Sequence, residues 1–404
     1  MSSDLSESFR RHVCQTSDSP IGLQVVSARG ATLRTSDGRE WIDFLAGIGV
    51  NNVGHAHPAV VAAIQEQAGR YLHAMVYGEY VLEPQVRLAE LLAKVAPPGL
   101  SVAYFTNSGT EANEGALKLA KKATGRRKLV AFRNSYHGDT HGSLSVTGRD
   151  VYRNPFLPLL PEVELLPFGD GAALGRIDET VAGVITEPIQ GEGGVRVPPD
   201  GWLPALRRRC TEAGALLIFD EVQTGLGRTG RLWAGEHWGV APDILVLAKA
   251  LGGGMPLGAF LGAPELMRTL SHDPPLAHVT TFGGHPVCCA AGLASLRIIL
   301  EEDLPRRAAE TGERIRAELR RMGERYGGVV DVRGLGMLIG LELDTAERTR
   351  AVAERAFAEG VIVGWTLHSD TVIRLAPPLN LSEAELERGL AGLETALAGA
   401  GSTR

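Results

Sequence analysis

The segment SVAYFTNSGTEANEGALKLAKK, residues 101–122, carries the local signals that decide the fold. Ser101–Thr106 is a short apolar run typical of a buried strand, and Thr110–Lys122 has a helical pattern. Ser108 and Glu111 have the spacing of a capping box, which predicts where the helix begins. Serine, glycine and threonine at a helix N-terminus make a candidate phosphate site, although a capped helix without a ligand explains this segment alone more simply.

The same alternation of strand and helix continues through the middle of the chain. Fifty glycines in 404 residues lie between these elements in short groups, as tight strand-to-helix turns require. This order predicts an α/β fold with a mostly parallel sheet and helices on both faces. The other predicted strands are Lys128–Phe132, Gly183–Pro188, Ala215–Val222, Asp243–Leu247 and Leu257–Gly262, and Trp202–Ala213 is a predicted helix.

The pattern changes after about Gly284, where we expect a smaller α+β lobe. Two long helical patterns are followed by short apolar runs and a last helix that opens at a capping box, Ser382 and Glu385. The predicted elements of this part are the helices Cys288–Glu302 and Arg306–Tyr326 and the strands Val329–Val332, Gly336–Leu343, Val361–Trp365 and Thr371–Leu375.

Composition narrows the class of protein. The 41 Lys and Arg against 47 Asp and Glu give a net charge of −6 without a basic block, which argues against a nucleic-acid partner. No apolar run approaches the length of a membrane span, and the polar N-terminus lacks the pattern of a signal peptide, so we expect a cytoplasmic protein. The four cysteines have no metal-ligand spacing and are expected to be reduced.

Two further segments place charged groups at the ends of predicted strands. Asp220 ends the run 216–220 and either caps the next turn or binds a cationic ring nitrogen or a metal. Lys249 follows the apolar run 245–248 and either extends to solvent or is a desolvated amine fit for Schiff-base chemistry. Each signal is weak alone, but a phosphate site, an acid and a lysine together are what pyridoxal phosphate requires.

The chain resembles the class III aminotransferases, the family of the acetylornithine, ornithine and ω-amino acid aminotransferases, over nearly its whole length. The matching motifs occur in family order, and their combination is highly specific. They are 54–58 (GHAHP), 107–113 (NSGTEAN), 136–138 (YHG), 187–192 (EPIQGE), 220–225 (DEVQTG), 227–230 (GRTG), 241–243 (APD), Lys249, 281–284 (TFGG) and 374–379 (RLAPPL).

The resemblance implies a fold type I pyridoxal-phosphate enzyme and assigns its cofactor residues position by position. Lys249 matches the lysine that forms the Schiff base and moves the proton, and Asp220 matches the partner of the pyridine nitrogen. The other matches are Ser108, Gly109 and Thr110 for the phosphate, Tyr136 for stacking on the ring with His137 after it, and Gln223 and Glu187 near the ring hydroxyl.

The same resemblance implies a domain division and an assembly. The expected units are an N-terminal segment, 1–50, that packs with the small domain, a large cofactor-binding domain with a seven-stranded type of sheet, 51–283, and a small α+β domain, 284–404. Thr281 matches a threonine that reaches the phosphate of the neighbouring subunit, which implies a homodimer with active sites at the interface. The sequence does not distinguish a dimer from a tetramer.

Two charged positions bear on the reaction. Arg374 matches the arginine that binds a substrate carboxylate, and Glu192 matches an acid that pairs with this arginine when no carboxylate is present. This pairing lets one pocket take an amine donor and a 2-oxo acid, with 2-oxoglutarate or pyruvate as the expected acceptor. The implied activity is ping-pong transamination through the Lys249 Schiff base.

Two positions depart from the acetylornithine and ornithine enzymes. Asp139 stands where those enzymes usually carry an arginine that grips a second carboxylate, and Ile48 stands at the place of an ornithine-type tyrosine. An acid at Asp139 repels a carboxylate and favours an amine or a hydroxyl, unless it only bonds to a neighbouring group. The predicted donor is therefore the ω-amine of a diamine, an amino acid or an amino-sugar-like molecule rather than N-acetylornithine.

Other functional classes are suggested by single features of the sequence. Residues 225–230 (GLGRTG) match the dinucleotide pattern, but no suitable helix follows, so an oxidoreductase is a remote alternative. The pairs His55 with His57 and His137 with His141 lack the spacing of a catalytic zinc site, and no metal is expected. A non-catalytic binding protein has no use for a buried Lys249. An aminomutase, epimerase or decarboxylase shares the cofactor residues and stays the main alternative.

Overall fold

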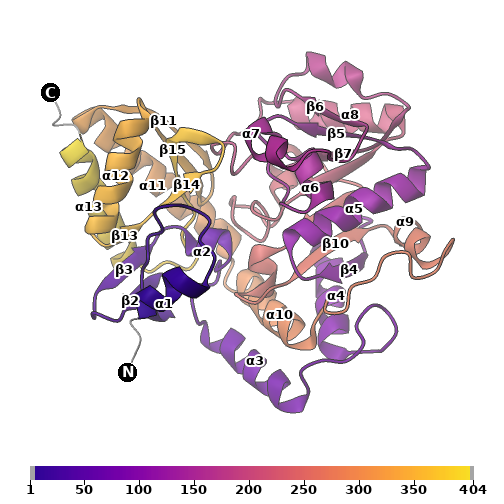
Figure 1. Cartoon of the computed structure of the whole chain (residues 1–404), viewed down its shortest axis with the longest axis horizontal. Coiled ribbons are helices and arrows are strands. Elements are labelled where there is room, and N and C mark those ends of the chain that lie inside the picture. The colour runs from indigo at the N-terminus through magenta and orange to yellow at the C-terminus, as the bar shows by residue number, and fades with distance from the viewer. Residues whose placement is uncertain (1–4, 401–404) are drawn as a thin grey trace.

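A computed structural model describes residues 5–400 and shows two lobes of unequal size (Figure 1). The larger lobe is built on a seven-stranded sheet of strand order β4-β10-β9-β8-β7-β5-β6. Only β10 runs antiparallel to its neighbours, so the predicted mostly parallel α/β sheet is confirmed. The strands are β4 (Val102–Thr106), β5 (Lys128–Phe132), β6 (Val163–Leu166), β7 (Val181–Thr186), β8 (Leu216–Asp220), β9 (Ile244–Leu247) and β10 (Gly258–Gly262).

Alternating side chains of the strands enter two hydrophobic cores, one on each face of this sheet. In β9, for example, Ile244 and Val246 pack toward α5, whereas Leu245 and Leu247 join the core that contains α8 and α10. The helices of this part are α3 (Pro58–Arg70), α4 (Glu83–Val95), α5 (Gly109–Thr124), α6 (His141–Val146), α7 (Asp150–Arg153), α8 (Trp202–Ala213), α9 (Pro264–Arg268) and α10 (Pro286–Glu301).

The smaller lobe joins both ends of the described chain. Strand β13 pairs in parallel with β3, and Ile42 and Phe44 share one core with helices α11 to α13. The strands are β1 (Val25–Arg29), β2 (Thr32–Thr35), β3 (Glu40–Asp43), β11 (Val329–Leu335), β12 (Leu338–Leu343), β13 (Val361–Ile362), β14 (Gly364–Thr366) and β15 (Ser369–Leu375), and the helices are α1 (Leu5–His12), α11 (Leu304–Tyr326), α12 (Ala346–Ala358) and α13 (Glu383–Ala400).

The capping box predicted at the last helix is confirmed. The backbone N–H of Glu385 donates to Ser382 Oγ at 3.3 Å, and Ser382 N–H donates to the Glu385 carboxylate at 2.9 Å. The other carboxylate oxygen accepts from the Ala31 N–H at 2.8 Å, so the cap also joins the N-terminal segment to α13. The predicted division at residues 50 and 283 stays a prediction. Helix α10 begins after residue 283, yet its apolar side chains pack into the core of the larger lobe.

Two features of the backbone depart from the expected elements. Strand β6 was not predicted, because it is a short, half-buried edge strand that pairs only with β5. The segment α2 (Ala46–Gly49) is a left-handed turn with φ of 51°, 60°, 68° and 71°. This conformation is unfavourable for Ala46 and Ile48, because their Cβ atoms come too close to the backbone. Within residues 5–400, no helix combines the length and apolar character needed to cross a membrane.

Candidate active site

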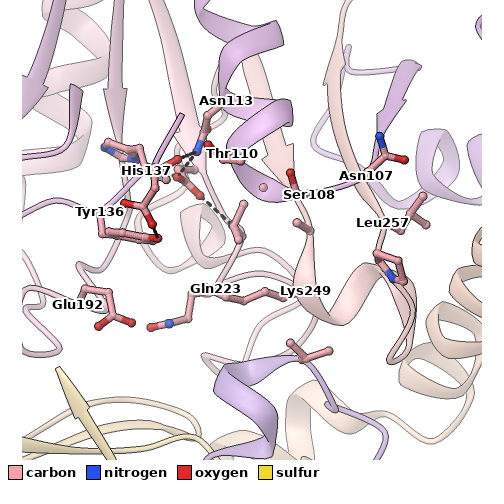
Figure 2. Close-up of a pocket in the computed structure, with 18 of the residues that line it drawn as sticks. Asn107, Ser108, Thr110, Asn113, Tyr136, His137, Glu192, Gln223, Lys249 and Leu257 are labelled. Carbon is pink, nitrogen blue, oxygen red and sulfur yellow. Dashed lines mark hydrogen bonds and ion pairs between the residues drawn. The ribbon is translucent and has the colours of Figure 1, made fainter. Parts of the chain in front are cut away.

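A cavity of about 560 Å³ lies where the parallel strands of the large sheet end. Turns that follow β4, β7, β8 and β9 supply Ser108, Glu187, Gln223 and Lys249 to its wall, so the sheet brings together residues far apart in sequence. Figure 2 shows Glu192, Gln223 and Lys249 along one side of this space. The other predicted site residues among its lining are Gly109, Thr110, Tyr136, His137, Asp139 and Asp220.

The phosphate-binding candidate is the N-terminus of α5. Ser108 Oγ accepts from the Glu111 N–H at 3.3 Å, but the Glu111 carboxylate accepts from the Asn107 backbone at 2.7 Å instead of completing the predicted box. At Gly109, a Cβ would lie 3.0 Å from the Val222 side chain, so the start of α5 packs closely against the turn that follows β8. The positive end of the helix faces the cavity and suits an anion.

Asp220 is a buried acceptor at the base of the cavity. Its Oδ2 accepts from Asn113 Nδ2 at 2.8 Å and lies 2.7 Å from His137 Nδ1, and its Oδ1 accepts from the Val222 N–H at 3.0 Å. These contacts hold the carboxylate in a fixed orientation. Sequence reasoning did not assign a role to Asn113, although it belongs to the motif at 107–113.

Glu187 is a second buried acid in the cavity wall. Its carboxylate accepts from the N–H groups of Tyr136 at 3.0 Å and Gly191 at 2.8 Å. Burial raises the pKa of Glu187 to about 7 despite these bonds and the nearby His137. Protonation at this position therefore responds to any charge that enters the cavity.

Lys249 follows β9 with a left-handed backbone, φ 48°, which is rare for a residue with a Cβ. Such a conformation costs about 1–2 kcal/mol and persists where surrounding structure enforces it, as at active sites. Burial lowers the pKa of the Lys249 amine, an effect that the charge of Glu192 opposes. The structure thus places a desolvated amine in the cavity wall.

Tyr136 and Asp139 form a pair at the cavity rim. The Tyr136 hydroxyl donates to Asp139 Oδ2 at 2.8 Å, and burial together with this bond raises the pKa of Tyr136. Asp139 is exposed and lines the cavity, so its charge acts on what enters.

Arg374 on β15 forms a buried ion pair with Glu192 Oε1 and donates to Gln223 Oε1 at 3.4 Å. Burial raises the pKa of Glu192, but the Arg374 charge and hydrogen bonds outweigh this effect and the pKa is lowered overall. The pair that the resemblance implied therefore forms, at the side of the cavity that faces the smaller lobe.

Three predicted site residues lie outside the cavity lining. Arg374 contacts the lining residues Glu192 and Gln223, and the other two are Ile48 and Thr281. Ile48 is 48% exposed in the left-handed turn, and Val50 lines the cavity in its place. Thr281 is exposed, whereas its neighbour Thr280 bonds to Asn107 at 3.1 Å. The roles predicted for Ile48 and Thr281 remain predictions. Among residues 5–400, no group of three or more His, Cys, Asp or Glu is arranged to hold a metal.

Glu221, next to Asp220, has a predictable effect on stability. Its carboxylate accepts from Ala234 and Gly235 N–H groups, and burial raises its pKa to about 7. The native state therefore binds this proton more tightly than the unfolded chain, so the stabilisation is present at low pH and is lost as pH rises through about 4.5–7. Relative to Glu221→Gln, the wild type is expected to lose on the order of 3 kcal/mol of unfolding free energy between pH 5 and 8. The unfolding free energy of each protein is measured by denaturant unfolding at several pH values, with the exposed substitution Glu179→Gln as control. If wild type and Glu221→Gln gave parallel profiles of unfolding free energy against pH, the prediction would be wrong.

Comparison with known proteins agrees with this geometry. The family model for "Aminotransferase class-III" matches residues 13–397. An acetylornithine aminotransferase of Methanopyrus kandleri is 46% identical over 391 residues, which are 96% of this chain and 97% of that protein.

Solved structures give the same result. An ornithine aminotransferase of Toxoplasma gondii superposes with a TM-score of 0.91 at 32% identity, covering 98% of this chain and 94% of that one. An amine transaminase from an uncultivated Pseudomonas species, in its PLP-bound form, superposes with a TM-score of 0.88 at 33% identity, covering 96% and 98%. This chain belongs to the class III aminotransferases, enzymes that use pyridoxal phosphate.

Proposed function

We propose that this enzyme transfers the primary ω-amino group of a diamine, amino acid or amino-sugar-like donor to a 2-oxo acid such as 2-oxoglutarate or pyruvate, by a ping-pong cycle. The observation that carries the proposal is the buried ion pair of Glu192 and Arg374 beside Lys249. An arginine that is neutralised in the absence of a carboxylate suits a site that takes two substrates in turn. An aminomutase, epimerase or decarboxylase has no need of this exchange, which disfavours those alternatives.

The residues present fit pyridoxal phosphate. The turn 108–110 offers an anion site, Asp220 offers a fixed carboxylate for the pyridine nitrogen, and Lys249 offers the amine. His137 Nε2 is buried without a hydrogen-bond partner in the described chain, beside the place that we assign to the ring. Tyr136, His137, Glu187 and Gln223 are the other proposed contacts.

The bound cofactor supplies an electron sink for a substrate carbanion. Lys249 Nζ, desolvated and with a lowered pKa, accepts the proton from the substrate carbon and returns it. Asn113 Nδ2 and the Val222 N–H donate to Asp220, and His137 Nδ1 lies 2.7 Å from it, so its carboxylate is held in place toward the ring. Arg374 leaves Glu192 to bind the carboxylate of the 2-oxo acid.

Asp139 supports an amine at the distal end of the donor. Of the other acids in the cavity lining, Glu192 is paired with Arg374, and Glu187 and Asp220 are assigned to the cofactor. Asp139 is therefore the acid left to attract a cationic end of the donor. Asp139→Arg is expected to reduce the preference for a diamine over N-acetylornithine by about tenfold or more, because a like charge replaces an opposite one. Steady-state kcat/KM for the two donors measures this, with Asp150→Asn as control. An unchanged preference would contradict the role of Asp139.

The similarity to an acetylornithine aminotransferase favours N-acetylornithine as the second candidate donor. Initial rates over a matrix of donor and 2-oxo acid concentrations, with identification of both products, test the proposed reaction. Parallel double-reciprocal lines and amino-group transfer to the oxo acid are expected; a product that is an isomer or a decarboxylated donor would instead establish one of the other reactions.

We also propose a homodimer in which Thr281 of one copy completes the phosphate site of the other. Apolar side chains near Thr281 are exposed, namely Leu276 at 61%, Val279 at 49% and Phe282 at 55%, as expected of a surface that a second copy covers.

A further inference from the structure

The turn between β14 and β15, residues 366–369, reaches from the smaller lobe to the acid of the proposed exchange. Glu192 Oε2 accepts from the Leu367 N–H at 2.9 Å, and the Glu192 carbonyl accepts from the His368 N–H at 3.0 Å. The ion pair with Arg374 uses the other carboxylate oxygen, Oε1. The Glu192 carboxylate is therefore held at both oxygens, one by Arg374 and the other by the Leu367 N–H.

Residues of the larger lobe hold the turn 366–369 in position. The Leu367 carbonyl accepts from the Tyr152 hydroxyl at 2.7 Å and from Arg149 Nη1 at 2.9 Å. The rings of Tyr152 and His368 stack with centroids 5.3 Å apart, and His368 Nδ1 lies 2.9 Å from the Asn134 carbonyl. These contacts set the position from which the Leu367 N–H points at Glu192.

We propose that the turn 366–369 is a second anchor for Glu192, positioned by Tyr152 and Arg149, which makes binding of a substrate carboxylate at Arg374 less costly. When Arg374 binds that carboxylate, Glu192 loses its cation inside a buried site, and an unpaired buried charge is strongly unfavourable. The Leu367 N–H compensates part of this loss. The inference rests on the proposed function, and Tyr152 and Arg149 are positioning residues in it.

Tyr152→Phe tests the anchor, because it removes one hydroxyl and keeps the ring that stacks on His368. Binding of glutarate, a dicarboxylate without a reactive oxo group, to the holoenzyme is measured by calorimetry. Loss of one hydrogen bond is expected to weaken it about three- to tenfold. The single-turnover rate with an amine that has no carboxylate is expected to stay within about twofold, because Glu192 and Arg374 need not separate. Asp150→Asn, on the same short helix, is the control.

A second pair of variants acts on the anchor itself. Leu367→Pro removes the N–H that Glu192 accepts, whereas Leu367→Ala removes only the side chain, and only the proline variant is expected to weaken glutarate binding. Unchanged glutarate binding in Tyr152→Phe, or an equal loss of the amine half-reaction, would overturn the inference. A wild-type enzyme that binds no glutarate and reacts with no amine would overturn the proposed function itself.

Discussion

Replacing Lys249 by alanine is expected to lower turnover by about 10⁴-fold or more, because the variant lacks both the amine that binds the cofactor and the base that moves the proton. The lysine lies in the cavity wall with a lowered pKa, which fits both roles. Turnover of a donor and a 2-oxo acid by the purified variant, loaded with pyridoxal phosphate, is the measurement.

Lys249→Arg is the matched variant, since it keeps the positive charge near Glu192 but not the nucleophilic amine. It is expected to be as inactive as Lys249→Ala while the two differ in stability. Multiple turnovers by Lys249→Ala would contradict the assignment of this residue.

Asp220→Asn is expected to lower kcat by about 10²–10³-fold, because a neutral amide cannot stabilise a protonated pyridine nitrogen as a carboxylate does. The amide also disturbs the contacts with Asn113 and His137, each of which lies within 2.8 Å of Oδ2. Single-turnover rates with saturating amine separate this chemical effect from weaker cofactor binding.

Glu221→Gln is the matched control for this experiment. Glu221 is the next residue and equally buried, but its carboxylate accepts from backbone groups at 234 and 235 and does not line the cavity. It is expected to keep kcat within a fewfold of the wild type. Equal losses in Asp220→Asn and Glu221→Gln would mean that the effect of Asp220 is structural.

Local signals allowed much of the larger lobe to be predicted from sequence. The strand Lys128–Phe132 and the helix Trp202–Ala213 have the expected bounds. An apolar run and a 3.6-residue period predict such elements well, because each pattern follows from which side chains are buried. Gly183–Pro188 was predicted as a strand, but β7 spans Val181–Thr186. The chain turns out of the sheet at Glu187 so that this carboxylate can reach the cavity wall.

Contacts between segments far apart in the sequence could not be predicted from local patterns. Glu192 and Arg374 are 182 residues apart, and only the resemblance to a family paired them. The bonds from Tyr152 and Arg149 to the Leu367 carbonyl had no sequence signal, because a backbone acceptor exists at every residue. The left-handed turn at Ala46–Gly49 contradicts the local preferences of Ala46 and Ile48 and depends on the Asp43 carboxylate, which accepts from Leu45 and Ala46 N–H groups.

The most direct test of the account is the absorbance spectrum of the purified, cofactor-loaded enzyme during addition of one substrate at a time. A primary amine added without a 2-oxo acid is expected to bleach the yellow cofactor and leave stoichiometric pyridoxamine phosphate, and later addition of 2-oxoglutarate or pyruvate is expected to restore the colour. A cofactor that binds Lys249 yet stays unconverted by every amine, while the donor is consumed, would contradict transamination.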